Sequence, residues 1–175
     1  PGDIVIDCGA CIGEIATIFA GYVGDKGEVH LFDPIPLHAK FCKLQASLNP
    51  ILTDVFHINT LAVGEKTFKV NRGTKIDNNK IRPGKIRIDQ FKTTSLDNYV
   101  SSNSITKVDF IKMDIEGAET DAIIGAKKIL KKYKPKLAIS IYHKPDDFWS
   151  IPLLIKDINT DYKFMFAHHS PIQWE

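Results

Sequence analysis

The sequence lacks a long apolar segment. Hydrophobic residues make up 43% of the chain, but no uninterrupted apolar run approaches the roughly 20 residues that a membrane-spanning helix needs. No basic stretch followed by an apolar one opens the chain, so no secretory leader is visible. Because the chain begins with Pro1 and reaches a strand-like segment almost at once, we expect residues 1–175 to form a single domain without its natural N-terminal segment.

A strong charge of either sign is also absent. Lysine and arginine total 23 against 21 aspartates and glutamates, a net charge of +2, so we expect no nucleic-acid partner. A lysine run at 127–136 fits either a nucleic-acid patch or the solvated face of a helix near its C-terminus, and the lack of interleaved aromatic residues favours the second. Cysteine is scarce, and the odd number of three argues against a disulfide scaffold. This favours a reducing compartment, and we expect a cytoplasmic protein.

Short apolar segments predict strands, and apolar residues at helical spacing predict helices. We expect strands at residues 3–8, 28–32, 55–63, 108–113, 136–142 and 162–168, with a seventh at 172–175. We expect helices at residues 12–22, 36–48, 95–100, 118–133 and 146–158. Residues 66–94 carry turn signals and few strong core residues, which predicts a β-hairpin insertion. Strands alternating with helices indicate an α/β protein with a parallel, doubly wound sheet and helices on both faces.

The segment VIDCGACIGE, residues 5–14, joins the first predicted strand to the first predicted helix. In open parallel sheets, ligands bind beyond the carboxyl ends of the strands, where the strand order reverses. Gly9 and Gly13 let the backbone approach a ligand, and the helix start offers free N–H groups. Asp33 ends the second strand, 20 residues after Gly13, where an acid can accept hydrogen bonds from ribose hydroxyls. The loop and the acid together predict an adenosine-bearing cofactor.

The charges of the loop distinguish between cofactors. The loop lacks the middle glycine of the dinucleotide fingerprint, and Asp7 would repel a pyrophosphate but attract an ammonium group, directly or through water. This favours S-adenosylmethionine, with an NAD-dependent oxidoreductase as the alternative. Cys8 and Cys11 suit either a redox dithiol or small residues packed in a tight loop, and the packing interpretation is preferred.

The loop, LFDPIP (31–36), VDFIKMDIEGAE (108–119) and ISIYHKPDDFWSIPLLI (139–155) make the chain resemble the FkbM-type methyltransferases, class I enzymes that use S-adenosylmethionine. The resemblance implies a Rossmann-like, mostly parallel, seven-stranded sheet ending in an antiparallel strand pair. It implies methyl transfer to a hydroxyl of a small molecule or glycan, such as a sugar or a secondary metabolite. A non-catalytic cofactor-binding module of this fold is the alternative. Cys11 departs from the family, where this position is usually polar, such as Asn, and Asp33 stands where Glu is frequent.

The position of residues in this fold implies their roles. The residues expected to line the methionine half of the cofactor are Asp7, Gly9, Ala10, Cys11 and Gly13, with Asp33 on the ribose, Pro34 and Ile35 on one adenine face, and Ala62 and Val63 on the other. Asp114, at the end of the fourth strand, is expected to reach the methionine amino group or a substrate hydroxyl.

A histidine and several acids are the candidates for catalysis. Histidine titrates near neutral pH, so His143 is the predicted general base, with Asp114 or Glu116 orienting it. Asp114 also fits a plain helix cap. Asp114, Glu116, Glu119 and His143 would suit Mg²⁺ or Mn²⁺, but their spacing is no recognised metal signature and we expect no metal.

Overall fold

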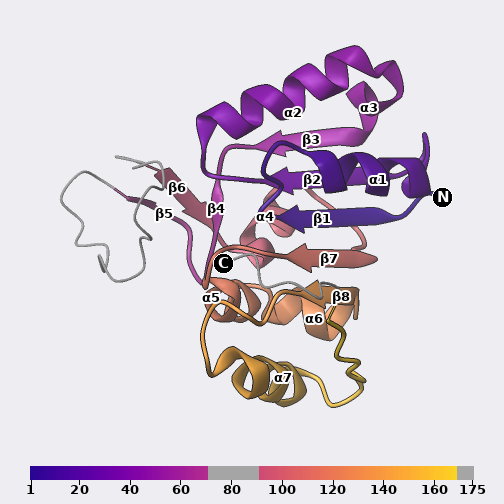
Figure 1. The fold of residues 1–175 in the computed structure, drawn as a ribbon. Helices are drawn as coiled ribbons and strands as arrows, with labels where there is room; N and C mark the ends of the chain where they lie inside the picture. Colours follow the sequence, from indigo (N-terminus) through magenta and orange to yellow (C-terminus); the bar gives the residue numbers. More distant parts are fainter. Residues whose placement is uncertain (71–90, 169–175) are drawn as a thin grey trace.

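The computed structural model describes residues 1–70 and 91–168. Its main sheet consists of β1 (Ile4–Cys8), β2 (Glu28–Phe32), β3 (Phe56–Asn59), β7 (Phe110–Met113) and β8 (Lys136–Ile139). The strand order is β3-β2-β1-β7-β8, and every neighbouring pair is parallel. The order reverses between β1 and β7 (Figure 1). The predicted parallel α/β sheet is confirmed with five strands, not seven, in the described residues.

Helices cover both faces of this sheet. They are α1 (Glu14–Val23), α2 (Pro36–Leu48), α3 (Pro50–Val55), α4 (Leu96–Ser102), α5 (Glu119–Ile124), α6 (Lys127–Lys132) and α7 (Asp147–Ile158). Successive strand residues point to opposite faces. Val5 therefore joins the core beneath α1–α3, and Ile6 joins the core beneath α4–α7. Among the described residues, no helix combines the length and the apolar character that a bilayer crossing requires.

A smaller sheet adjoins the main one. It contains β4 (Ala62–Val63), β5 (Phe68–Val70) and β6 (Phe91–Thr94), in the order β4-β6-β5. β5 and β6 pair antiparallel, as expected for the base of the predicted hairpin insertion. The remainder of that insertion, residues 71–90, lies outside the described residues.

Two predicted elements are divided in the structure. The strand predicted at 55–63 is present only in two pieces, β3 and β4, and its first residue, Val55, ends α3, a helix whose first position is occupied by Pro50. The helix predicted at 118–133 separates into α5 and α6 around Gly125. A Cβ at Gly125 would lie 2.2 Å from the carbonyl oxygen of Gly64, so the helix is interrupted where two backbone segments approach closely.

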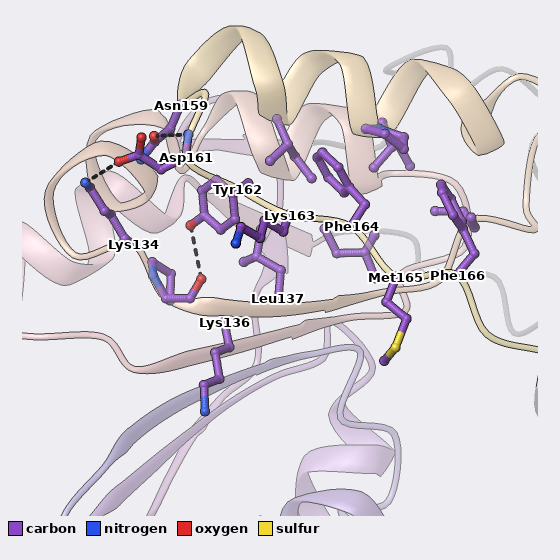
Figure 2. A pocket seen from close by; sticks show the side chains of 16 residues that line it. Lys134, Lys136, Leu137, Asn159, Asp161, Tyr162, Lys163, Phe164, Met165 and Phe166 are labelled. Carbon is purple, nitrogen blue, oxygen red and sulfur yellow. Dashed lines mark hydrogen bonds and ion pairs between the residues drawn. The ribbon is translucent and has the colours of Figure 1, made fainter.

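The strand predicted at 162–168 is wrong, because these residues are irregular. Side chains hold the segment instead: Phe166 packs on Phe148 with ring centroids 4.9 Å apart, and the Tyr162 hydroxyl donates to the Pro135 carbonyl at 3.0 Å. A cavity of about 570 Å³ lies between this segment, β8 and α7 (Figure 2). Its lining residues all fall between 134 and 166, away from the ends of β1 and β2. The strand predicted at 172–175 lies outside the described residues.

Candidate active site

The glycine loop, residues 9–13, lies where the strand order reverses. Gly9 follows β1, and Asp114 follows β7 on the other side of the reversal; the Asp114 N–H donates to the Cys8 carbonyl oxygen at 3.1 Å. Gly9 has a φ of +83°, and a Cβ there would lie 1.9 Å from the Asp114 carbonyl oxygen. Only glycine fits both the conformation and the contact. The ends of β1 and β7 therefore meet at the expected ligand crevice.

Backbone hydrogen bonds hold the loop against β2. The N–H groups of Gly9 and Ala10 both donate to the Phe32 carbonyl oxygen, at 2.9 and 3.1 Å. Gly13, with a φ of +90°, turns the chain into α1, and a Cβ there would lie 3.2 Å from the Cys42 sulfur. The loop is thus fixed beside the residue that follows Phe32, which is Asp33.

Asp33 stands next to the glycine loop, as predicted. Its Oδ2 accepts a hydrogen bond from the Cys11 N–H at 3.1 Å, and its Oδ1 accepts one from the Ile35 N–H at 2.8 Å. His38 Nδ1 lies 2.9 Å from Oδ2. A carboxylate oxygen can accept more than one hydrogen bond. Because the Asp33 side chain keeps 12% of its surface exposed, it can hold the loop and still accept from a ligand hydroxyl.

Asp7 is enclosed by the protein. Its exposed surface is 0%, and its Oδ1 lies 3.2 Å from the ammonium of Lys112, its register neighbour on β7. Burial raises the pKa of Asp7, and the Lys112 charge opposes that rise. Lys112 Nζ also donates to the Gly9 carbonyl oxygen at 2.8 Å. In this structure the Asp7 carboxylate has no exposed surface, and Asp7 supports the loop through Lys112.

The three cysteines are free thiols. Cys8 is completely buried, whereas Cys11 is exposed at the tip of the loop. Burial raises the pKa of the Cys8 thiol, and partial burial raises that of the Cys11 thiol, but a redox dithiol needs a thiolate of lowered pKa. The structure therefore favours packing for Cys8 and gives Cys11 no redox character. Cys11 has a φ of 48°, a conformation in which Asn is enriched.

The residues expected beside adenine differ in exposure. Pro34 and Ile35 are half-buried and follow Asp33 directly. Val63 is buried in the core beneath α4–α7, whereas Ala62 is half-buried. Of the two β4 residues, Ala62 has the accessible surface that a contact with adenine needs.

His143 and three acids form an acid–histidine cluster, defined as Asp114, Glu116, Glu119 and His143. The His143 side chain is 4% exposed. Its Nε2 lies 3.5 Å from Asp114 Oδ1 and 3.8 Å from Glu116 Oε2, and its Nδ1 lies 3.1 Å from Glu119 Oε1. The structure thus brings together the three predicted catalytic residues, and Asp114 places them beside the glycine loop.

Glu119 is the member of this cluster for which the sequence predicts no catalytic role. It is completely buried at the start of α5, and its Oε1 also accepts the Ile115 N–H at 2.9 Å. Asp114 or Glu116 was expected to orient His143, but Glu119 faces Nδ1. The sequence does contain a signal for this role: Glu119 is an acid in the first turn of a helix, and such a side chain can reach back to the residues before the helix.

The turn before α5 has an uncommon backbone. Glu116 has a φ of 60° and Gly117 one of 91°. A positive φ costs energy outside glycine and is found often at functional sites. Beside this turn, the Tyr142 hydroxyl donates to Asp114 Oδ1 at 3.1 Å, and the Tyr142 ring lies 4.2 Å from the His143 ring. The turn and Tyr142 together determine where Asp114 and Glu116 lie relative to His143.

Three members of the cluster also offer metal donors. Asp114, Glu119 and His143 each have a donor atom within 4.8 Å of the others. Carboxylate oxygens and an imidazole nitrogen form a mixed set compatible with Mg²⁺ or Mn²⁺. Three of the four residues that could bind Mg²⁺ or Mn²⁺ therefore lie close together. The contact between Glu119 and His143 supports the alternative role of His143 as a general base.

A family model, the methyltransferase FkbM domain, matches residues 7–169. The chain belongs to this family. The glycine loop, Asp33 and the acid–histidine cluster all lie within the match. The resemblance found in the sequence is thereby confirmed, and membership in this methyltransferase family implies S-adenosylmethionine as the cofactor.

Two solved structures are similar to this one. The crystal structure of methyltransferase FkbM from Methylobacillus flagellatus KT has 28% sequence identity and a TM-score of 0.79, with 99% of this chain and 42% of that chain covered. The crystal structure of a putative rRNA-methylase from Clostridium thermocellum has 14% identity and a TM-score of 0.52, with 93% and 72% covered; that likeness shows the fold alone. No curated protein matches this chain significantly. The chain thus spans less than half the length of its FkbM relative.

Proposed function

We propose that this protein transfers the methyl group of S-adenosylmethionine to a hydroxyl group of a sugar, a glycan or a secondary metabolite. One observation carries the proposal: the glycine loop held by Asp33 meets the acid–histidine cluster at the strand-order reversal. The first part suits an adenosine-bearing cofactor, and the second suits removal of a proton from an acceptor.

The loop and residues 33–35, together called the cofactor half, fit the chemistry of S-adenosylmethionine. Asp33 would accept hydrogen bonds from the ribose hydroxyls, and the first N–H groups of α1 would face the carboxylate. Lys112, the cation beneath the loop, is already engaged by Asp7 and by the Gly9 carbonyl. Because Lys112 is already paired, the loop offers no free positive charge to a pyrophosphate. This favours a cofactor without phosphates over NAD.

The acid–histidine cluster fits the role of general base. S-adenosylmethionine supplies an electrophilic methyl group when bound. His143 would take the acceptor proton at Nε2, the nitrogen nearer Asp114 and Glu116. Glu119 would hold the ring at Nδ1 and stabilise the imidazolium that forms. A positioned base contributes about 10²- to 10⁴-fold in rate, and correct orientation of the reactants contributes several kcal/mol, up to roughly 7–11.

Cofactor choice can be tested by binding alone. Thermal-shift and calorimetric titrations would compare S-adenosylmethionine, S-adenosylhomocysteine and NADH. We expect both sulfur compounds to bind and to raise the melting temperature, and NADH to do neither. Binding of NADH with no binding of S-adenosylmethionine would support an oxidoreductase instead.

Turnover can be tested with a panel of hydroxyl-bearing acceptors. Sugars, glycans and cell extracts would be incubated with S-adenosylmethionine, and products would be analysed for the mass gain of one CH₂ group. We expect a methylated hydroxyl that disappears in His143→Ala. Cofactor binding without turnover on any acceptor would favour a non-catalytic module of the same fold.

A further inference from the structure

A second histidine cluster lies at the opposite end of the sheet from the glycine loop. It consists of Glu28, His30 and His57. Glu28 opens β2, and His30 pairs in register with His57 on the edge strand β3. Alternation along β2 places Glu28 and His30 on one face, the face that carries α4. Methyl transfer at the other end of the sheet uses none of these side chains.

The donor atoms of this cluster converge. Glu28 Oε2 lies 2.9 Å from His30 Nε2 and 3.4 Å from His57 Nε2. All three residues have a donor atom within 4.8 Å of the others. Zinc bonds of about 2.0–2.1 Å in a tetrahedron would separate neighbouring ligand atoms by about 3.3 Å. The Glu28–His57 separation of 3.4 Å is close to that value, whereas the Glu28–His30 separation of 2.9 Å is a hydrogen-bond distance that would lengthen when a metal ion binds.

A second layer of hydrogen bonds holds His30. Its Nδ1 lies 2.9 Å from the Tyr99 hydroxyl, which also receives a hydrogen bond from Asn59 Nδ2 at 3.1 Å. The His30 side chain is only 4% exposed, so its ring is fixed with Nε2 toward Glu28. Metal-binding histidines characteristically use their second nitrogen in this way, which sets the tautomer and the orientation of the ring.

The other two ligands are accessible from solvent. The side chains of Glu28 and His57 are 42% and 43% exposed. The rings of His30 and His57 are stacked, with centroids 4.5 Å apart and an angle of 15° between the planes. The lone pairs of stacked rings run side by side, so His57 must turn about its Cβ–Cγ bond to point its Nε2 at a shared ion. Its exposure at the sheet edge permits that rotation.

We propose that Glu28, His30 and His57 bind one divalent transition metal ion, with Zn²⁺ as the ion best suited to two imidazoles and a carboxylate. Water would complete the coordination. The ion would link β2 to the edge strand β3, and binding to the folded state alone would stabilise the protein. This site is independent of the proposed methyl transfer, so either assignment can fail without the other.

The test uses metal-free protein without a histidine tag. Wild type, His57→Gln and His143→Gln would be titrated with Zn²⁺ by calorimetry and with Co²⁺ by visible absorption. His143→Gln is the matched control, because the acid–histidine cluster also offers metal donors. We expect one tight site in wild type and in His143→Gln, with affinity at least about tenfold weaker in His57→Gln. Circular dichroism checks that each variant folds, and Glu28→Gln at an equally exposed position replaces His57→Gln if it does not.

Three results would overturn the proposal. The first is wild-type protein that binds neither ion. The second is His57→Gln with wild-type affinity, and the third is loss of binding in His143→Gln instead. In the first two cases, the Glu28–His30 contact is a structural hydrogen bond only.

Discussion

The cofactor half and the acid–histidine cluster differ in how their carboxylates are paired with other groups of the protein. In the cofactor half, Asp33 accepts two backbone N–H groups, and Asp7 beneath the loop is paired with Lys112. In the cluster, three carboxylates surround a single imidazole, that of His143. The two regions are nevertheless adjacent, because Gly9 touches Asp114.

This difference separates two tasks. In the cofactor half, the charged side chains are already paired with groups of the protein. They hold the glycine loop in one position, and this position does not depend on proton transfer. Both ring nitrogens of His143 face carboxylates, and an imidazole is the side chain that most often acts as a general base. The first region is suited to holding a cofactor and the second to changing protonation during a reaction. The contrast predicts that substitutions in the two regions affect different measurements.

The largest effect is expected from His143→Ala. Loss of the proposed base should lower turnover by about 10²- to 10⁴-fold, while affinity for S-adenosylmethionine should stay unchanged because the cofactor half is intact. Single-turnover kinetics and calorimetry would measure the two quantities. The exposed His168 provides the control His168→Ala, which should retain both. Full turnover in His143→Ala would remove this residue from the mechanism.

Gly9→Ala should disrupt the packing of the glycine loop against Asp114 and so destabilise the folded protein. The new Cβ would meet the Asp114 carbonyl at 1.9 Å in a conformation with φ +83°, so we expect a loss of about 3 kcal/mol or more in the free energy of unfolding. Chemical denaturation would measure it. Gly21 in α1 has open space around it, and Gly21→Ala should stabilise the protein by up to about 1 kcal/mol. Equal stability of the two variants would contradict the tight contact between loop and Asp114.

Asp33→Ala should weaken cofactor binding more than it changes folding. Removing charge-assisted hydrogen bonds of about 1.5–3 kcal/mol corresponds to roughly 10- to 100-fold in dissociation constant. Calorimetry with S-adenosylmethionine would measure it, with Asp54→Ala on the exposed surface of α3 as the control. Wild-type affinity in Asp33→Ala would count against the ribose assignment.

Glu119→Gln should have a smaller, purely kinetic effect. The neutral amide lacks the charge that we propose stabilises the imidazolium, and we expect kcat to fall by about tenfold. KM for the cofactor should stay constant, and the pH–rate profile should move, which a merely structural role would not cause. The matched control is Asp121→Asn, an exposed acid of the same helix. An unchanged pH profile would limit Glu119 to holding the Ile115 N–H.

Cys11 should show the smallest effect. Burial raises the pKa of its thiol, and only the thiolate reacts with alkylating agents. Near pH 8 its reaction with iodoacetamide should be slower than that of free cysteine, and the rate should rise as the pH approaches the raised pKa. Mass spectrometry would follow the reaction, with Cys11→Ser as the control. Fast alkylation at neutral pH would restore the redox interpretation.

Strong local signals allowed several elements to be predicted closely. β2 and α2 have the predicted bounds, because the segment Asp33–Pro34 separates them and Pro36 suits a first helical position. Ser95 caps α4 as expected, accepting the Asn98 N–H at 3.2 Å. The strand predicted at 162–168 failed because its alternating residues pack through side chains, whereas a strand needs a backbone partner.

Local sequence is sufficient to predict the alternation of strands and helices, the glycine loop and the acid that follows β2, because these depend on residues close together in the chain. Which charged side chains meet depends on how the chain is folded in three dimensions. Lys112 reaches Asp7 because their strands are neighbours in register, and Glu119 reaches His143 because β7 and β8 end side by side. Such pairs depend on strand order and on burial, and no local pattern of residues encodes either.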